Sequence, residues 1–316
     1  SRHHLHMVRL GAWLWGLAVL SSLCLLGHAY HGSYWHVTIP WWSLSTAEEG
    51  APLLLALSMR LDFVAAAMLC MATTVGLGVY SYSMAYMAEA PGAPRYFALL
   101  ATFLGAMLVL VLANDLWLLF ISWELLSYTS YMLIGFEHRR AAAAAASTQA
   151  LVVNQLGSTC LLLALLIIQR VEGSVVLPLP GAMPALPPDA HTWLTAAGLC
   201  FLVAATAKSA QLPLWHWLPA AMEAPTPASA LMHAATLGSA GAYMLLRVGP
   251  WLAPTVQLLT VGVGGLTALW GAWAALHQYH LKRLLAYATI SQLGYVIMAI
   301  GMGAYSAALF HLITHA

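Results

Sequence analysis

Charged residues are scarce in this chain of 316 residues. Asp, Glu, Lys and Arg make up 7% of it, and 62% of its residues are hydrophobic, whereas soluble domains carry about 25% charged residues. The formal net charge of +1 gives no electrostatic support for a nucleic-acid partner. This composition excludes an ordinary soluble domain and predicts a multi-pass integral membrane protein whose surroundings are a lipid bilayer.

Paired cysteines and nucleotide-binding motifs are also lacking. Cys24, Cys70, Cys160 and Cys200 each lie singly in an apolar run, without CxxC or Cys/His metal spacing. This pattern predicts no disulfide framework and no metal site. The glycine-rich motifs GxGxxG and GxxxxGK[ST] do not occur. We therefore expect no cofactor in this chain.

Apolar runs of bilayer length recur along the whole sequence, and about 20 apolar residues suffice for one helix to cross. We expect ten spans, the last beginning near residue 304 and the others at 8–28, 62–87, 96–113, 115–136, 142–169, 192–212, 226–247, 251–276 and 283–302. Between the first two spans, an aromatic and β-branched segment is split by Glu48, Glu49 and Gly50. It predicts an extramembrane β-hairpin near 35–61, within residues 30–61.

The expected fold is thus an all-α polytopic membrane protein in a single transmembrane domain, 1–316. If each span crosses the membrane in turn, the Lys and Arg residues at the ends of the spans or outside them fall at two opposite ends of the domain. One end receives Arg2, Arg9, Arg95, Arg139, Arg140, Lys282 and Arg283; the other receives Arg60, Arg170 and Arg247. The excess makes the first end cytoplasmic. The chain starts without Met and stops inside the apolar pattern FHLITHA, so we expect a fragment that lacks N- and C-terminal helices.

Two opposite charges lie inside predicted spans. Glu124 sits near the middle of 115–136, and Lys208 lies deep in 192–212. Each costs about 2–4 kcal/mol at a helix centre unless it is paired or hydrated. The two predict a buried ion pair in which withdrawal of the carboxylate lets the desolvated lysine release a proton. A salt bridge that only holds helices together is the alternative.

Four prolines follow Lys208 closely, at Pro213, Pro219, Pro225 and Pro227. They predict a discontinuous helix near 208–225. Backbone freed at membrane depth is tolerated only where protein covers it or where it lines a cavity, which is a recurring arrangement at ion sites in transporters. A proline kink without function is the alternative.

Histidines and a further lysine complete the candidate proton path. His233 lies in the span after the break, Lys282 begins a later span, and His311 and His315 share a helix face as an i,i+4 pair. Histidines with near-neutral pKa values relay protons through water. The alternatives are a core histidine at 233, a lysine reaching the interface at 282, and an HxxxH metal site for which no third ligand is evident.

The chain resembles a known family over the region from about residue 60 to its end. The resemblance rests on the order and spacing of SWELLSYTSYMLIGF, AKSAQLPLWHWLPAAMEAPTPASALMHAATL, LKRLLAYATISQLGY and GAYSAALFHLITHA. These stretches are similar to the antiporter-like subunits of respiratory complex I, in particular the chain L family of NADH:quinone oxidoreductase. They are also similar to the large subunit of Mrp-type antiporters.

The resemblance assigns a role to each matching residue. It implies that Glu124 of the WE motif and Lys208 of KSAQ form the pair that modulates proton release. It places His233 of HAAT and Lys282 of the KR motif on a central polar axis with His311 and His315, within a proton-translocation core at 115–316. The chain departs from many relatives at Ser158, Ala220 and His280, where an acid is common.

The resemblance implies a proton-translocating membrane-arm subunit of a complex I-type NADH:quinone oxidoreductase, in a bacterial inner membrane. NAD, FMN, iron–sulfur clusters and quinone are then expected in partner subunits, and other membrane-arm subunits are the expected partners. The alternatives are the large subunit of an Mrp-type Na⁺/H⁺ antiporter, a proton-driven subunit for inorganic-carbon uptake, and a structural scaffold. The sequence leaves H⁺ alone or H⁺ with Na⁺ open.

Overall fold

The computed structural model of the chain describes residues 2–32, 34–44, 53–178 and 190–316. Its elements in order are α1 (Arg2–Tyr30), β1 (Trp35–Leu44), β2 (Leu53–Leu61), α2 (Phe63–Tyr86), α3 (Ala93–Leu112), α4 (Leu116–Ile134), α5 (Ala141–Glu172), α6 (His191–Lys208), α7 (Trp217–Ala220), η2 (Ala221–Glu223), α8 (Thr226–Ala234), α9 (Leu237–Val248), η3 (Gly249–Trp251), α10 (Pro254–Leu276), α11 (Leu281–Gly301) and α12 (Tyr305–His315). The expected hairpin turn with Glu48, Glu49 and Gly50 lies outside the described residues.

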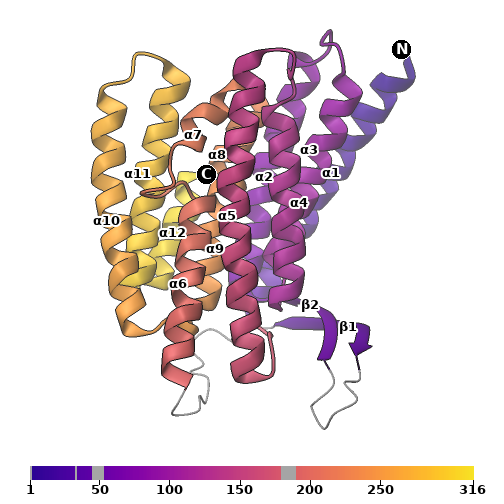
Figure 1. Cartoon of the computed structure of the whole chain (residues 1–316). Coiled ribbons are helices and arrows are strands. Elements are labelled where there is room, and N and C mark those ends of the chain that lie inside the picture. Colours follow the sequence, from indigo (N-terminus) through magenta and orange to yellow (C-terminus); the bar gives the residue numbers. More distant parts are fainter. Residues whose placement is uncertain (1, 33, 45–52, 179–189) are drawn as a thin grey trace.

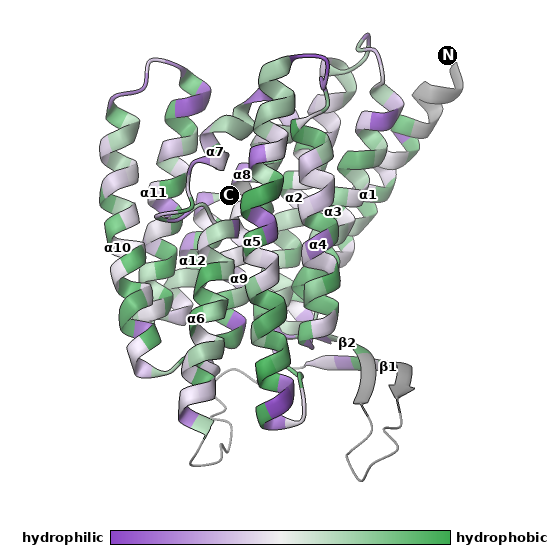
Figure 2. Ribbon diagram, viewed as in Figure 1, coloured by the Kyte–Doolittle hydropathy of each residue, from purple (hydrophilic) through white to green (hydrophobic). Residues whose placement is uncertain are grey.

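The long helices run side by side in one bundle, with α1 at one edge and α10 at the other (Figure 1). Within the described residues, seven helices are long and apolar enough to cross a membrane. They are residues 8–30 of α1, and α2, α3, α4, α5, α10 and α11. Hydrophobic residues cover their lengths, while hydrophilic ones gather at several connections (Figure 2). The prediction of an all-α multi-pass membrane protein is confirmed.

The connections lie at the ends of the bundle that the order of the predicted spans assigned to them. The α2–α3, α4–α5 and α10–α11 connections lie at the end where α1 begins, and the hairpin lies at the opposite end (Figure 1). We call the first the α1-start end and the second the hairpin end. The assignment of the α1-start end to the cytoplasm remains a prediction from the excess of Lys and Arg.

Aspartates begin two of the helices at the hairpin end. The carboxylate of Asp62 accepts the backbone amide of Ala65 and starts α2. Asp115 accepts the amide of Leu118 at 2.8 Å and starts α4. An aspartate at this position satisfies one of the amides that a helix N-terminus leaves free. The local sequence therefore sets where both spans begin.

The predicted hairpin is present and is joined to the bundle. Strands β1 and β2 pair in antiparallel fashion, from Trp35 opposite Leu61 to Leu44 opposite Leu53. The amide of Ser58 in β2 donates to the carboxylate of Asp115 at 2.5 Å. This contact fixes the hairpin against the start of α4.

Two predicted spans differ from the structure. The span 192–212 ends earlier, because α6 stops at Lys208. The span 226–247 is not continuous: it divides into α8 and α9, with a break at Ala235 and Thr236. Thr236 turns its hydroxyl back to the carbonyl of Leu231 at 2.8 Å, so its side chain competes with regular helical bonding.

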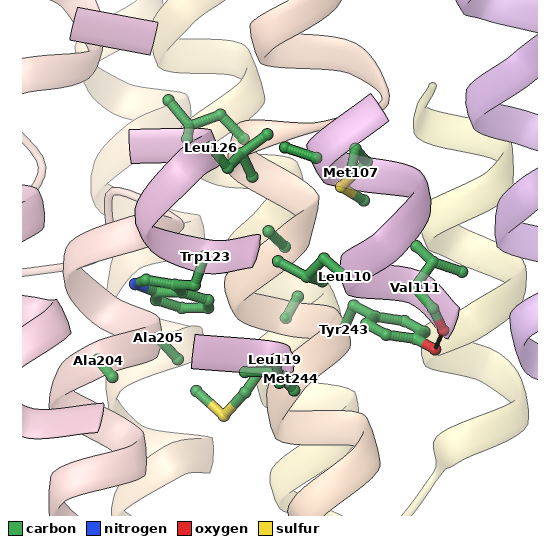
Figure 3. Close-up of a cluster of buried hydrophobic side chains, with 14 of the residues drawn as sticks. Met107, Leu110, Val111, Leu119, Trp123, Leu126, Ala204, Ala205, Tyr243 and Met244 are labelled. Carbon is green, nitrogen blue, oxygen red and sulfur yellow. Dashed lines mark hydrogen bonds between the residues drawn. The ribbon is translucent and has the colours of Figure 1, made fainter. Parts of the chain in front are cut away.

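A buried apolar cluster lies between α3, α4, α6 and α9 (Figure 3). Trp123 of α4 is fully buried, as are Met107 and Leu110 of α3. Tyr243 of α9 donates its hydroxyl to the carbonyl of Val111 at 2.6 Å, so its one polar group is satisfied (Figure 3). This cluster holds Trp123 in place beside the candidate site.

Glycines bring α10 and α11 into close contact. A Cβ atom added at Gly264 would lie under 3 Å from the backbone of Met298, and one at Gly294 would lie 2.6 Å from the amide of Ala268. Small residues at helix interfaces let backbones approach in this way, and dispersion contacts drive helix packing in lipid.

We expect Gly264→Leu to separate α10 from α11 and to lower the free energy of unfolding by about 1–3 kcal/mol or more, as overpacking does. Gly262→Leu is the matched control, because nothing lies within 4 Å of its added Cβ. The measurement is the thermal midpoint of both variants in detergent. Equal midpoints for the two would contradict close packing at Gly264.

Candidate functional site

Lys208 ends α6 inside the bundle and is fully buried. Its Nζ donates to the backbone carbonyl of Trp123 at 3.2 Å and to the hydroxyl of Ser127. The same ammonium lies 4.5 Å from the centre of the Trp123 ring, in a cation–π contact. Since Trp123 and Ser127 are i and i+4 on α4, one helix face supplies all these contacts. Neutral groups therefore hold this buried cation.

Glu124 projects from the same helix and is half-buried. Its Oε2 accepts a hydrogen bond from Gln155 of α5 at 3.3 Å, while its Oε1 is buried without a partner among the described residues. It lies near enough to Lys208 to attract it electrostatically. However, no ion pair joins the two among the described side chains, so the structure corrects the expected buried ion pair and also lacks the alternative, a salt bridge that only holds helices together. Gln155 holds the carboxylate instead.

The backbone opens into irregular structure directly after Lys208, as the prolines predicted. The freed groups have protein partners: Trp217 donates its indole N–H to the carbonyl of Ala207 at 2.8 Å, and Thr267 accepts the amide of Leu212 at 3.1 Å. These contacts cover polar backbone in the way that membrane depth requires. The discontinuous helix near 208–225 is therefore present, with α7 and η2 inside it.

The four prolines have different positions in this break. Pro213 lies in the irregular segment, and Pro219 lies inside the short helix α7. Pro225 and Pro227 flank the start of α8, where a missing backbone N–H is harmless. These last two prolines therefore begin a helix and do not interrupt one, which corrects their expected role.

A cavity of about 440 Å³ brings together His233 of α8, Lys282 of α11 and His315 of α12. Both ring nitrogens of His233 and Nε2 of His315 are buried without a hydrogen-bond partner among the described residues. Most of the cavity wall is apolar, but buried polar atoms are nearly always hydrogen-bonded, and the space is large enough for waters that would bridge these three nitrogens. The cavity therefore has the character of a hydrated chamber.

His311 joins this chamber indirectly. Its Nε2 lies 2.8 Å from Oε1 of Gln292, which also lines the cavity. Lys282 lies 3.4 Å from the carbonyls of Met222 and Ala224, next to the broken segment. The structure thus groups His233, Lys282, His311 and His315 around the chamber, and Glu124 with Lys208 at a separate place between α4, α5 and α6.

Sequence reasoning did not anticipate a second charged cluster, at the hairpin end. Arg247 of α9 donates to both oxygens of Asp62, at 2.5 and 2.9 Å, and to the hydroxyl of Tyr243 at 2.7 Å. The Nε of Arg60 lies 3.2 Å from Asp62. Arg60 also donates to the carbonyl of Leu177 at 3.1 Å. The sequence feature that could have indicated this cluster is Arg247, which lies at the end of the apolar run MLLRVG.

Trp123 and Ser127 were also missed as ligands of Lys208. The signal was a tryptophan and a serine one helical turn apart in SWELLS, flanking the glutamate. A buried ammonium needs such polar and aromatic partners.

We expect Ser127→Ala to leave the buried ammonium of Lys208 short of one partner and to lower the free energy of unfolding by about 1–3 kcal/mol. Ser122→Ala is the matched control, since Ser122 is buried on α4 and, among the described residues, bonds only to carbonyls of its own helix. Thermal midpoints of the two variants give the comparison. An equal decrease of the thermal midpoint in both variants would show that the bond from Lys208 to Ser127 does not stabilise the protein.

The part of the chain that carries the candidate site matches one protein family. Residues 113–316 match the family described as NADH:quinone oxidoreductase/Mrp antiporter, transmembrane. Residues 50–97 match the N-terminus of chain 5 of NADH–ubiquinone oxidoreductase (complex I).

Individual relatives and solved structures agree. NADH-quinone oxidoreductase subunit L of Mycobacterium tuberculosis is 42% identical over 261 residues, covering 81% of this chain and 41% of that protein. NAD(P)H-quinone oxidoreductase chain 5 of Synechocystis sp. is 45% identical over 272 residues, covering 81% of this chain and 38% of that one. This chain thus spans about two-fifths of the length of these relatives.

A chain of the Mrp complex from Dietzia sp. superposes with a TM-score of 0.77 at 33% identity, covering 93% of this chain and 32% of that one. A chain of the archaeal membrane-bound sulfane sulfur reductase shares the fold, with a TM-score of 0.78 at 21% identity over 96% of this chain and 62% of that one. With its family match, its relatives and its fold, the chain belongs to the NADH:quinone oxidoreductase/Mrp antiporter transmembrane family.

Proposed function

We propose that this chain belongs to a proton-translocating membrane-arm subunit of a complex I-type NADH:quinone oxidoreductase, with its translocation core at 115–316. The observation that carries the proposal is Lys208: it is fully buried and held by a carbonyl, a hydroxyl and an aromatic ring, with a carboxylate nearby but unpaired with it. Ionisable groups inside membrane helices mark ion and proton paths.

The proton path proposed here uses two groups of residues. Protons enter from the α1-start end through the chamber lined by His233, Lys282 and His315. They pass by way of bridging water to Lys208. When Glu124 turns from Gln155 toward Lys208, the pair favours the charged ammonium; when it turns back, the desolvated lysine gives up its proton.

The redox chemistry lies elsewhere in this proposal. NAD, FMN, iron–sulfur clusters and quinone belong to partner subunits, and the energy arrives through neighbouring membrane-arm subunits. This chain then contributes proton translocation to the oxidoreductase, as part of a translocase in a bacterial inner membrane. The support is that its relatives include subunits of NADH-quinone and NAD(P)H-quinone oxidoreductases.

The second candidate is the large subunit of an Mrp-type Na⁺/H⁺ antiporter. The likeness to a chain of the Mrp complex over 93% of this chain favours it. Both candidates require the same buried groups, so Lys208 and Glu124 do not separate them.

The test is proton uptake by vesicles that contain the full-length protein in its native complex. We expect addition of NADH, with quinone as acceptor, to drive uptake without added sodium. Proton movement that requires a sodium gradient and is indifferent to NADH would favour the antiporter. Vesicles without the complex give the background leak.

A further inference from the structure

A basic cavity lies at the α1-start end of the bundle, lined by residues other than those of the proposed proton path. Its volume is about 420 Å³, and its lining includes Arg95 of α3 and His138, Arg139 and Arg140 of the α4–α5 connection. None of the groups assigned to proton translocation lines it. We call it the basic cavity.

Two of its three arginines have no carboxylate partner among the described residues. Arg95 donates to the carbonyl of Phe136 at 2.9 Å and lies over the Phe136 ring, at 4.8 Å from its centre. Arg139 is exposed and has no hydrogen bond or ion pair within the described part of the chain. Both therefore carry positive charge that is available to an anion.

Arg140 is different, because two carboxylates already bind it. Its Nη1 lies 3.0 Å from Glu137 and its Nη2 lies 2.8 Å from Glu223. Glu137 also lines the cavity, but its charge is directed to Arg140. Glu89, on the α2–α3 connection, does not line the cavity. The ligand-binding charge thus rests on Arg95 and Arg139.

Two helix N-termini meet the same cavity. Gly92 precedes α3 and Arg140 precedes α5, and neither provides a side-chain hydrogen bond to the first helical turn. The first amides of α5 and the positive end of each helix dipole favour a negatively charged group at such a place. At α3, Pro94 has no N–H and Ala93 already donates to Ala90, so that helix adds mainly its dipole. The two helix ends add to the arginines and make a phosphate the fitting ligand, since guanidinium groups bind phosphate oxygens with two parallel hydrogen bonds.

A second cavity continues the basic cavity toward the membrane-spanning parts of α4 and α5. It measures about 250 Å³, shares Arg95 and His138 with the basic cavity, and continues between Tyr131 and Met132 of α4 and Ala144 of α5. These residues lie within the apolar spans α4 and α5. A free anion needs only the first cavity, whereas a phospholipid presents a phosphate and a glycerol backbone with acyl chains below it.

We propose that these two cavities bind an anionic phospholipid, with its phosphate at Arg95 and Arg139 and its glycerol backbone between α4 and α5. Basic pockets between transmembrane helices bind such headgroups elsewhere. None of the groups assigned to proton translocation lines the site; one link between the two is Arg140, which binds Glu223, and Glu223 lies between the two residues whose carbonyls contact Lys282. The proposal holds whether the protein is a redox-linked pump or an antiporter.

The experiment is native mass spectrometry of the full-length protein in its complex, titrated with phosphatidylglycerol and, separately, with phosphatidylcholine. We expect selective retention of phosphatidylglycerol. The double variant Arg95→Gln/Arg139→Gln is expected to weaken that binding about 10- to 30-fold, at roughly 1 kcal/mol per arginine near the membrane surface. Arg170→Gln, an exposed arginine at the other end of α5, is the matched control and is expected to leave binding unchanged.

Three outcomes would overturn the proposal. Equal retention of the two lipids shows no site for an anionic headgroup. An equal effect of Arg170→Gln shows only general attraction to basic residues. Displacement of the lipid by millimolar inorganic phosphate, with no preference between lipids, assigns the cavity to a free anion. The single variant Arg139→Gln changes an exposed side chain that has no partner in the described part of the chain. It is expected to weaken binding several-fold without changing the thermal midpoint, which separates ligand loss from misfolding.

Discussion

Replacing Lys208 with methionine is expected to lower NADH-driven proton uptake about tenfold or more, while assembly and stability are kept. Methionine fills nearly the same volume without a charge, so no cavity forms. A buried cation held by neutral partners is expensive, and an apolar replacement of similar size is often neutral or stabilising. Loss of a group that transfers protons typically lowers a rate by about 10²–10⁴-fold.

The measurement compares proton uptake per NADH oxidised in vesicles matched for assembled complex, together with the thermal midpoint. The proposed role predicts a lower ratio with an unchanged or higher midpoint. A structural role predicts the reverse pattern, a lower midpoint with full uptake. Cys160→Ala, a small change on α5 at a side chain with no hydrogen bond to Lys208 or to its partners among the described residues, controls for reconstitution.

Replacing Asp62 with asparagine is expected to destabilise the hairpin end of the bundle by about 3–5 kcal/mol. Asp62 is the counter-ion of two buried arginines, Arg60 and Arg247, whose side chains are 4% and 2% exposed. Asparagine is a good residue at a helix N-terminus, so the cap of α2 is preserved and only the charge is lost. The two guanidinium groups are then left without a carboxylate.

Asp115→Asn is the matched control, because Asp115 also begins a helix and accepts the amides of Ser58 and Leu118, but forms no ion pair within the described part of the chain. We expect it to lower the free energy of unfolding by about 1 kcal/mol. Thermal or denaturant unfolding of the two variants in detergent measures the difference. If both variants lose the same small amount, the cluster around Asp62 does not stabilise the fold.

The same cluster predicts a dependence on pH. Burial alone raises the pKa of Asp62, but the hydrogen bonds and charge of Arg247, with the Ala65 amide and Arg60, bring the pKa below its usual value. A carboxylate with a lowered pKa in the folded state stabilises the protein above about pH 4 and loses that contribution as the pH falls further. Asp62→Asn is therefore expected to flatten the acid limb of the stability profile.

Much of the fold follows from patterns that are local in the sequence. Apolar runs of membrane length predicted the spans, because a bilayer requires about 20 apolar residues for each crossing. The β-branched and aromatic residues before Asp62 predicted the hairpin. The prolines after Lys208 predicted the first break, since proline removes a backbone donor.

The break between α8 and α9 could not be predicted in this way. Residues 226–247 read as one apolar helix, and at the interruption the local bond of Thr236 to Leu231 is joined by tertiary contacts. Ser209, at the end of α6, donates its hydroxyl to Gly238 at 2.7 Å and accepts the amide of Ala242 at 3.1 Å. These bonds hold the start of α9 against the end of α6. Because they come from Ser209, the sequence of residues 226–247 alone does not predict them.

The sequence predicted which ionisable residues lie in the site better than it predicted which residues they bond to. Ionisable residues in apolar spans identified Glu124, Lys208 and His233, because such residues are rarely placed there without a function. Their partners were not predictable, since Gln155 reaches Glu124 from α5 and Lys208 reaches α4 from α6. The same holds for the charged cluster at the hairpin end. Asp62 and Arg247 are 185 residues apart in the chain. Only the folded arrangement shows that Glu124 bonds to Gln155 and that Lys208 bonds to α4 backbone and hydroxyl groups.

The proposed coupling of Glu124 to Lys208 is tested most directly by the number of protons moved per electron in four forms of the native complex. These are the wild type, Glu124→Gln, Lys208→Met and the double variant, all at matched assembly. If the two residues act as one switch, each single variant lowers the ratio and the double variant is no worse than Lys208→Met alone, because interacting residues give non-additive losses. Losses that simply add, or a ratio that stays at the wild-type value in Lys208→Met, would contradict the account.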